Sequence, residues 1–359
     1  MISLNLQAPN SIDPQKNKLM KYTLIALSIL TAVSALSWGL TSILLVVIAV
    51  AVAVFLDYAL SLVMKAKGPV NALSAVVFGQ IVALSYSLAN TSSFAFGYYL
   101  TSYYEPELLP LTAPMAFVYV ALISAVGMVL FKKLQGLLKR KYVNPAAAAK
   151  LLVFLPSLQN VLFAQAHSNS LALAGPVGYS YNSTSLSGAF ASLIVGCFGN
   201  IPIRPDTLTV SPTQVFQTLT ILKYHGWVGG ASSLVVIIVG LSLFIIARKY
   251  VKWRITLSYL VAVTIMSLIM FAAYGGDLLL RIGFELFIGS SIFLAFFMAI
   301  DPATTPEKHT AQGIFGLGLG VLTVLIQMYM GFLGGSILAL VIMNLTSPLL
   351  DRIGRKATV

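Results

Sequence analysis

From Ser42 to Met64 the chain reads SILLVVIAVAVAVFLDYALSLVM, an apolar run with a single charged residue, Asp57. A helix rises about 1.5 Å per residue, so a run of this length matches the roughly 30 Å hydrocarbon core of a bilayer. The run lacks the apolar–polar alternation of membrane barrel strands. Because backbone polar groups in lipid must be paired within a helix or a closed barrel, the run predicts a transmembrane helix.

The same pattern recurs along the rest of the chain. Hydrophobic residues make up 58% of the 359 positions and charged residues only 9%, whereas a soluble domain carries about 25% charged residues. The composition therefore excludes a water-soluble globule and predicts an all-α integral membrane protein with about ten transmembrane helices. The expected spans lie near 22–38, 42–64, 70–90, 111–131, 146–165, 227–247, 254–274, 279–300, 312–329 and 332–349.

Polar segments divide the chain into two membrane halves. A long stretch between the halves contains many Ser, Asn, Gly and Pro residues. Its segment 176–198 could be a further crossing, because Ala189 to Phe198 is apolar, although the polar residues Tyr179 to Ser185 precede it. The predicted organisation is a tail at 1–21, a first membrane half at 22–165, a loop or re-entrant segment at 166–226, a second half at 227–350 and a tail at 351–359.

The distribution of positive charge predicts the orientation. The net charge is +12, but the basic residues occur in short clusters between apolar runs, which is typical of cytoplasmic loops and not of a nucleic-acid-binding face. If residues 166–226 do not cross the membrane, every cluster lies on one side together with both termini. We therefore expect a multi-pass plasma-membrane protein with cytoplasmic termini, residues 166–226 outside and no nucleic-acid partner. The clusters are Lys16/Lys18/Lys21, Lys65/Lys67, Lys132 to Lys141, Arg248 to Arg254 and Arg352 to Lys356.

Two pairs of similar segments suggest an internal repeat of two five-helix halves. Residues 71–77 resemble residues 230–236, and some 70 residues after each comes an Asn144-Pro145 or an Asp301-Pro302 pair. Duplicated halves are common in transporter folds. The predicted helix count nevertheless puts Asn144 and Asp301 on the same side of the membrane, whereas an inverted repeat would put them on opposite sides.

Acidic residues in or beside the spans are candidates for an ion pathway, because ionisable groups in a membrane are costly. Asp57 is either part of an ion or proton relay or a residue within reach of the interface near Lys65. Asp277, Arg281 and Glu285 are spaced by four and share one helical face. They predict either an ion-pair ladder at a helix start or a contact with an ion or a quinone headgroup.

The Asn144-Pro145 and Asp301-Pro302 pairs predict helix starts at the inner interface, because Asn and Asp are good N-caps and Pro suits the first turn. The alternative is that such a helix N-terminus presents free N–H groups to an anionic or ring-carbonyl ligand. The series Gly313, Gly316, Gly318 and Gly320 predicts close helix packing. The three His residues are dispersed, so neither a metal site nor a catalytic residue is expected from this chain alone.

The C-terminal part carries a resemblance. Residues 293–306 read FLAFFMAIDPATTP, Gly313 to Gly316 follow, and residues 334–351 read GGSILALVIMNLTSPLLD. Together with YVNPAA at 142–147 and Trp253-Arg254-Ile255, this resembles the RnfD family of the Rnf ion-translocating electron transport complex. It is also similar to the related NqrB family of the sodium-translocating NADH:quinone reductase. The resemblance covers roughly residues 40–355.

The resemblance implies a subunit of a redox-driven pump that couples electron flow through flavin to Na⁺ or H⁺ transport, and not an enzyme alone. Its partners would be the other membrane and soluble subunits of such a complex and the lipid bilayer. The family carries FMN on a Thr in a Ser-Gly-Ala-Thr segment of the outer loop. That segment does not occur here; Ser187-Gly188-Ala189 is followed by Phe190, and Thr213 is the better candidate. Further flavin or riboflavin contacts by analogy are Asn144, Pro145, Asp301 and Thr304.

Two other functions remain open from the sequence. The suggested repeat and the altered flavin motif fit a stand-alone permease or channel on the same scaffold. A third reading is a membrane anchor for another enzyme.

Overall fold

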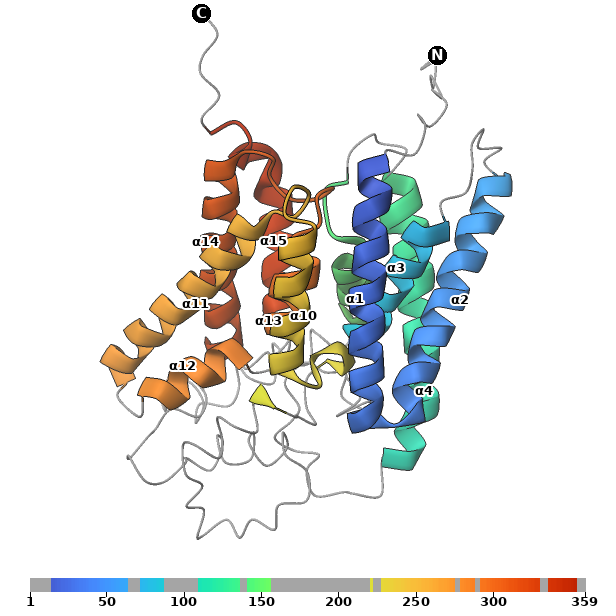
Figure 1. Cartoon of the computed structure of the whole chain (residues 1–359), viewed down its shortest axis with the longest axis horizontal. Helices are drawn as coiled ribbons and strands as arrows, with labels where there is room; N and C mark the ends of the chain where they lie inside the picture. The colour runs from blue at the N-terminus through green and yellow to red at the C-terminus, as the bar shows by residue number, and fades with distance from the viewer. Residues whose placement is uncertain are drawn as a thin grey trace, which may run out of the picture.

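The structure is a computed structural model and describes residues 14–63, 72–86, 109–135, 141–155, 220–221, 227–274, 278–287, 291–329 and 335–353. These residues form helices, some of them with short turns between them, which confirms the predicted all-α membrane fold (Figure 1). Within this part of the chain, five helices are long and apolar enough to cross a membrane and four shorter helices are also apolar. The total of about ten spans stays a prediction.

The N-terminal helices pack side by side (Figure 1). α2 contacts both α3 and α4, and α1 contacts α2 and α3. A single residue, Gly39, joins the first two helices; its φ of 61° lies in the left-handed region, which glycine adopts readily. The first helix begins at Pro14, inside the segment predicted as a tail. The elements are α1 (Pro14–Trp38), α2 (Leu40–Val63), α3 (Ala72–Leu84), α4 (Leu109–Val126) and its π-helical continuation η3 (Gly127–Leu134).

The C-terminal helices form a second group in which α11 packs on α14 and α14 packs on α15. α10 contacts α1 of the first group, and it also contacts α13 and η5. The elements of this group are η4 (Val228–Gly230), α10 (Ser233–Ile246), α11 (Trp253–Tyr274), α12 (Leu278–Phe287), α13 (Ser291–Phe293), the π-helix η5 (Leu294–Met298), α14 (His309–Tyr329) and α15 (Gly335–Leu350). The helix Pro145–Leu155 precedes them and contacts α4 through Tyr119 and Phe154.

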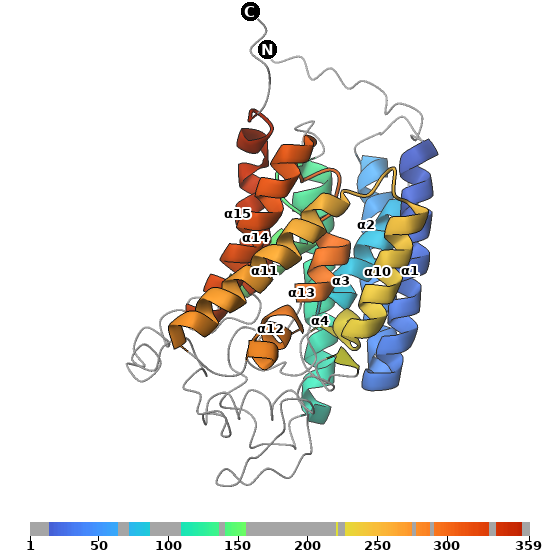
Figure 2. The same ribbon diagram turned by 60° about the vertical axis from the view of Figure 1, so that its left-hand side comes forward.

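The span predicted near 279–300 consists of two helical pieces. α12 is a short helix below the tilted α11, and α13 with η5 starts anew beside α10 (Figure 2). Hydropathy averages the polarity of a window of residues, so it does not show where one apolar segment divides into two helices.

Glycines bring α11 and α14 into close contact, as the glycine series predicted. A Cβ on Gly316 would collide with Ser258 and with the Ile255 carbonyl, and a Cβ on Gly320 would lie 2.8 Å from the Tyr259 carbonyl. Gly318 packs against Met343, whereas Gly313 has open space around it. Three of the four glycines therefore serve helix packing.

One end of the bundle gathers the positive charge, and we call it the basic end. Lys132 Nζ donates to the Ser74 carbonyl there, and Lys252 Nζ donates to the Pro302 carbonyl. The end of α15 reaches the same place, because Ser347 Oγ donates to the Thr304 carbonyl. The start of α1 lies at this end too, since Leu19 and Met20 share a pocket with Lys132 and Pro302. Which side of the membrane this end faces stays a prediction.

The predicted repeat receives mixed support. α3 and α10 run in opposite directions, because Val228 N, just before α10, donates to the Tyr86 carbonyl just after α3. Inverted halves would have this property. Asn144 and Asp301, however, lie at the same end, as the helix count predicted.

Candidate functional site

A pocket at the basic end collects residues from both halves of the chain. Its volume is about 110 Å³, several times the space that a single water needs. Asn144, Pro145 and Asp301, which the sequence marked as candidate cofactor contacts, all line it. The other lining residues are Leu19, Met20, Thr23, Ser74, Val77, Phe78, Ile81, Lys132, Lys141, Ala146, Leu243, Tyr250, Val251, Phe297, Ile300 and Pro302.

The pocket combines an apolar body with charged groups. Phe78, Phe297 and Ile300 contribute apolar wall, while Lys132 and Lys141 contribute positive charge. Lys132 Nζ donates to the Ser74 carbonyl at 2.7 Å and lies 5.4 Å from the centre of the Phe78 ring. A flat apolar ligand with a carbonyl or anionic edge suits such a site, because ammonium groups donate to oxygens while aromatic walls cover the ring.

Asn144 caps the helix that starts at Pro145, as predicted. Its Oδ1 accepts hydrogen bonds from Ala146 N at 3.1 Å and Ala147 N at 3.2 Å. Pro145 has no N–H, so the first-turn donors of this helix are used within the protein. The alternative, in which free N–H groups bind a ligand, therefore does not fit these residues.

Asn144 also ties the pocket to the C-terminal helices. Its backbone N donates to Asn344 Oδ1 at 2.9 Å, and its Nδ2 donates to the Met298 carbonyl at 3.3 Å. Asn344 Nδ2 in turn donates to the Thr304 carbonyl at 3.4 Å. Thr304 is therefore connected to Asn144 through Asn344, but it does not line the pocket. The buried Thr304 hydroxyl has no hydrogen-bond partner among the described residues.

Asp301 does not start a helix, so that prediction is wrong. Its Oδ1 accepts from Ala303 N at 3.1 Å and its carbonyl accepts from Thr305 Oγ1 at 2.6 Å, which closes a turn. The next helix begins only at His309. Pro306 explains the delay, because a proline disfavours the helical conformation of the residue before it.

Lys252 holds this turn from the loop between α10 and α11. Its Nζ donates to the Pro302 carbonyl at 3.2 Å, the Thr305 carbonyl at 2.8 Å and Thr305 Oγ1 at 3.0 Å. Burial lowers the pKa of the Lys252 ammonium below its ordinary value, and the carboxylates of Asp301, Glu307 and Asp351 oppose that shift.

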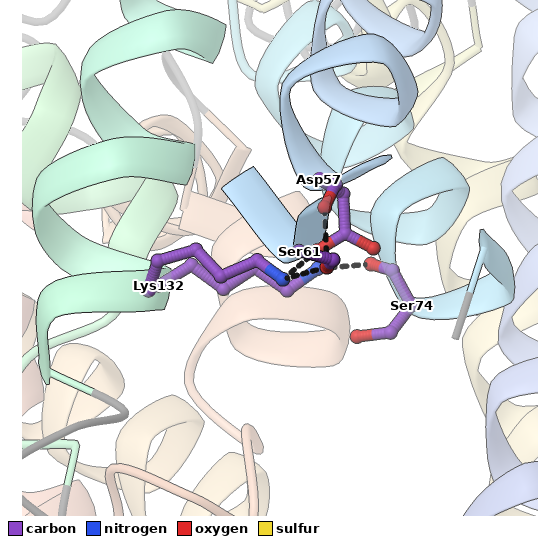
Figure 3. Close-up of polar contacts among 5 residues, drawn as sticks. Asp57, Ser61, Ser74 and Lys132 are labelled. Carbon is purple, nitrogen blue, oxygen red and sulfur yellow. Dashed lines mark hydrogen bonds and ion pairs between the residues drawn. The ribbon is translucent and has the colours of Figure 1, made fainter. Parts of the chain in front are cut away.

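Asp57 has a cation partner beside the pocket. Lys133 Nζ lies 2.6 Å from Asp57 Oδ1 and donates to Ser61 Oγ at 3.0 Å. Figure 3 shows Asp57 and Ser61 of α2 next to Ser74 of α3 and Lys132 of η3. The Asp57 carboxyl is therefore paired with a lysine near the basic end. This position is compatible with both predictions for Asp57, a part of an ion or proton relay and a residue within reach of the interface.

Of the remaining predicted residues, only Glu285 is described by the structure, and it does not line the pocket. Glu285 is buried on α12 with 1% of its surface exposed, and Tyr259 of α11 lies within its electrostatic range. Asp277 and Thr213 lie outside the described residues, as do Cys197 and almost all of the predicted outer segment 166–226.

Sequence reasoning missed three features of this region. Asn344 and Lys150 are buried polar residues inside predicted spans, and the cost of polar groups in a membrane was the signal that could have marked them. The π-helical turns η3 and η5 had no signal in the sequence. π-turns are rare in proteins as a whole, but those that occur are often found at functional sites. Here η3 supplies Lys132 to the pocket and η5 supplies Phe297.

Comparison with known proteins finds subunits of ion-translocating complexes that are similar to this chain. The D subunit of the Na(+)-translocating ferredoxin:NAD(+) oxidoreductase complex of Acetobacterium woodii is 27% identical over 336 residues, which cover 93% of this chain and 87% of that protein. The D subunit of an ion-translocating oxidoreductase complex of Shewanella amazonensis is 31% identical and covers 68% of this chain and 71% of its own length. The B subunit of the Na(+)-translocating NADH-quinone reductase of Stutzerimonas stutzeri is 27% identical, with 73% and 60% covered.

The sequence pattern of the NQR2, RnfD, RnfE family matches residues 87–359. This range contains Asn144, Asp301 and Asn344, whose hydrogen bonds build the pocket wall. The resemblance noted in the sequence is thereby confirmed, and the chain belongs to the NQR2, RnfD, RnfE family.

Proposed function

We propose that this chain is a membrane subunit of a redox-driven ion-translocating electron transport complex, in which it carries flavin and helps couple electron flow to Na⁺ or H⁺ transport. The observation that carries the proposal is the family match over residues 87–359, together with relatives named as subunits of ion-translocating oxidoreductase complexes. The chain acts with the other membrane and soluble subunits of such a complex, in the plasma membrane with both termini cytoplasmic.

The pocket at the basic end supports a flavin as ligand. Phe78 and Phe297 offer aromatic wall to an isoalloxazine ring, and Lys132 and Lys141 offer donors for its carbonyls or for a phosphate. The side chain and backbone N of Asn144 are engaged within the protein, so this residue shapes the wall without donating to the ligand. A bound flavin would supply one- and two-electron chemistry at this position.

A second flavin, FMN, is proposed as a covalent group on Thr213 in the outer segment. Thr213 lies outside the described residues, so this proposal rests on the family resemblance, from which the flavin is expected on the outer segment that contains Thr213. Asp57, Asp277 and Glu285 are proposed for the ion pathway, because carboxylates are the ionisable oxygen ligands that membrane segments use for Na⁺ or H⁺.

In-gel fluorescence tests the covalent flavin. The chain, expressed with its native flavin transferase, is run on a denaturing gel and viewed under ultraviolet light. A fluorescent band is expected for the unmodified chain and for the control Thr209→Ala, and no band is expected for Thr213→Ala. A dark band from the unmodified chain, or a bright band from Thr213→Ala, rejects FMN at this residue.

Copurification and transport test the proposed complex. The tagged chain is expected to bring further subunits with it, and the reconstituted complex is expected to move Na⁺ or H⁺ only when an electron donor is added. Lys141→Met is expected to lower the acid-extractable flavin, whereas the exposed control Lys249→Met retains it. A chain that purifies alone and moves a solute without any donor would instead be a permease.

A further inference from the structure

Lys150 is a lysine inside the membrane part of the bundle, and neither the pocket nor the proposed ion pathway uses it. It lies on the helix Pro145–Leu155, and 1% of its surface is exposed. Lys150 is therefore among the largest completely buried side chains of the described residues. An ionisable residue in such a position points to a function in ion or proton transport.

Among the described residues, two groups contact the amine of Lys150. Its Nζ donates a hydrogen bond to the Ser85 carbonyl, and it lies 4.7 Å from the centre of the Trp227 ring. Trp227 is itself buried and contacts Phe293 edge-on, with 5.8 Å between ring centroids. The ammonium is thus stabilised by one carbonyl and one aromatic face.

The carbonyl belongs to the C-terminal end of a helix that stops within the bundle. α3 ends at Leu84, about 20 Å from its start at a rise of 1.5 Å per residue, so this end lies well inside a bilayer core of roughly 30 Å. The C-terminus of a helix carries partial negative charge. Interrupted helices with such ends bind cations in transporters, and here the Lys150 ammonium lies at that position.

No carboxylate among the described residues pairs with Lys150. The ionisable side chains nearby are phenols: Tyr86 follows Ser85, and Tyr119 contacts Phe154, one turn along the helix from Lys150. The Tyr86 hydroxyl is buried and has no hydrogen-bond partner in the described part of the chain. An ammonium has three N–H donors, of which the described residues satisfy one by a hydrogen bond and another by the ring. A charged and a neutral Lys150 are therefore both compatible with its surroundings.

We propose that Lys150 is the proton-binding group of this subunit, with its ammonium at the position where a free cation would otherwise bind at the end of α3. This inference rests on the proposed function and names the ion that this site handles as H⁺. In the step, the Lys150 Nζ–H bond breaks, the proton passes to a water molecule to give hydronium, and the electron pair stays on nitrogen as a neutral amine. Uptake of a proton from water restores the ammonium.

Substitution by arginine separates this role from a structural one. Lys150→Arg keeps a positive charge near Trp227, but arginine does not lose its proton in proteins. The intact complex, reconstituted in liposomes, is driven by its electron donor while proton movement and donor oxidation are recorded together. Protons moved per electron are expected to fall about tenfold or more, because Arg cannot cycle between two protonation states. The control Lys249→Arg, on an exposed turn, is expected to match the unmodified complex.

A second substitution covers the case in which Lys150→Arg does not assemble. Trp227→Leu removes the ring that stabilises the ammonium and leaves the amine in place. The pH midpoint of proton movement is expected to shift downward by about half a unit or more, since a cation–π contact favours the charged form. The control is Trp253→Leu, whose ring lies 4.9 Å from the guanidinium of Arg254 at the basic end, and it is expected to leave the midpoint unchanged.

The outcomes separate the two proposals. An unmodified complex that moves no ions with its donor contradicts the proposed function. A complex that moves ions equally well with Lys150→Arg, or whose pH midpoint does not respond to Trp227→Leu, overturns the role of Lys150 and leaves the proposed function standing. In that event, the lysine serves only to close the end of α3.

Discussion

Asn144 connects three parts of the chain through one buried side chain and its backbone. Its Oδ1 satisfies two N–H groups of the helix Pro145–Leu155, its Nδ2 reaches the end of η5 at Met298, and its backbone N reaches Asn344 on α15. Buried polar groups are costly when they lose a partner. The pocket wall therefore depends on an amide with one acceptor and one donor at this position.

Substitution of Asn144 is expected to separate these contacts. Asn144→Ala loses the cap and the side-chain hydrogen bond to the Met298 carbonyl, which keeps the Asp301 backbone N as a donor, at a cost of about 1 to 3 kcal/mol. Asn144→Asp keeps the acceptor and loses the donor, so its loss should be about half as large. Thermal inactivation of the detergent-purified protein measures both. Equal stability of Asn144→Ala and the unmodified chain would contradict the capping role.

Lys252 is expected to make the stability of the folded protein depend on pH. Burial lowers the pKa of Lys252 below its ordinary value of 10.5, so the unfolded chain binds this proton more readily than the folded chain does. Stability from this group therefore rises as pH increases from the lowered pKa towards 10.5, and it is constant below that window. Nearby Asp301, Glu307 and Asp351 favour the charged form and narrow the window.

The prediction is a difference between two proteins. Thermal stability of the unmodified chain relative to Lys252→Met is expected to increase with pH in this alkaline window, because only the unmodified chain carries the titrating group. Scans at several pH values measure the difference. A difference that decreases with pH would mean that folding raises the pKa of Lys252.

At the scale of elements, the contact between α11 and α14 rests on glycines. A Cβ at Gly316 would collide with Ser258 and the Ile255 carbonyl, whereas a Cβ at Gly313 would meet nothing. Gly316→Ala is therefore expected to cost about 1 to 3 kcal/mol. Gly313→Ala, its matched control on the same helix, is expected to be neutral or stabilising by up to about 1 kcal/mol. Thermal scans of the two variants measure this contrast, and equal melting would rule out close packing at Gly316.

The positions of the long helices could be predicted from the sequence, whereas the breaks between shorter helices could not. Spans such as 42–64 and 254–274 were predictable because hydropathy alone requires a helix in lipid, and α2 and α11 match them within a few residues. The division between α12 and α13 was not predictable, because it depends on packing and not on composition. The prediction that Asp301 starts a helix was wrong because its side chain closes a local turn instead. Aspartate is favoured both in turns and at helix N-caps, so residue type alone does not distinguish the two.

The same division applies to the site. Asn144, Pro145 and Asp301 could be selected by residue type and by resemblance, and the structure places them in one pocket. Lys132 could not be selected, because its place in the wall depends on the π-helical turn η3. Lys150 could have been selected as the single charged residue in the predicted span 146–165, but an average of hydropathy over the span hides one charge.

Across the described part of the molecule, the outer surface of the bundle is largely apolar and the basic clusters lie at one end, whereas Glu285 on α12 and Lys150 are buried. Large apolar side chains on α1, α2 and α10 face outward; Leu36, Phe55 and Ile245 are more than two-thirds exposed. Such a surface is stable in contact with lipid or with another membrane subunit. The described basic residues of the predicted clusters lie at the basic end, which the distribution of charge in membrane proteins assigns to the cytoplasm.

Cysteine labelling tests this assignment. Cys197 is the only cysteine of the chain, so Cys197→Ser provides a background for single new cysteines. Glu307→Cys lies exposed at the basic end, and Thr209→Cys lies in the segment predicted outside. An impermeant thiol reagent added to intact cells is expected to label only Thr209→Cys, and Glu307→Cys is expected to react once the membrane is opened. The physical reason is that basic loops resist translocation, so the end that carries Lys132 and Lys252 should stay in the cytoplasm. Labelling of Glu307→Cys in intact cells would reverse the orientation and place the pocket proposed for flavin on the outer face.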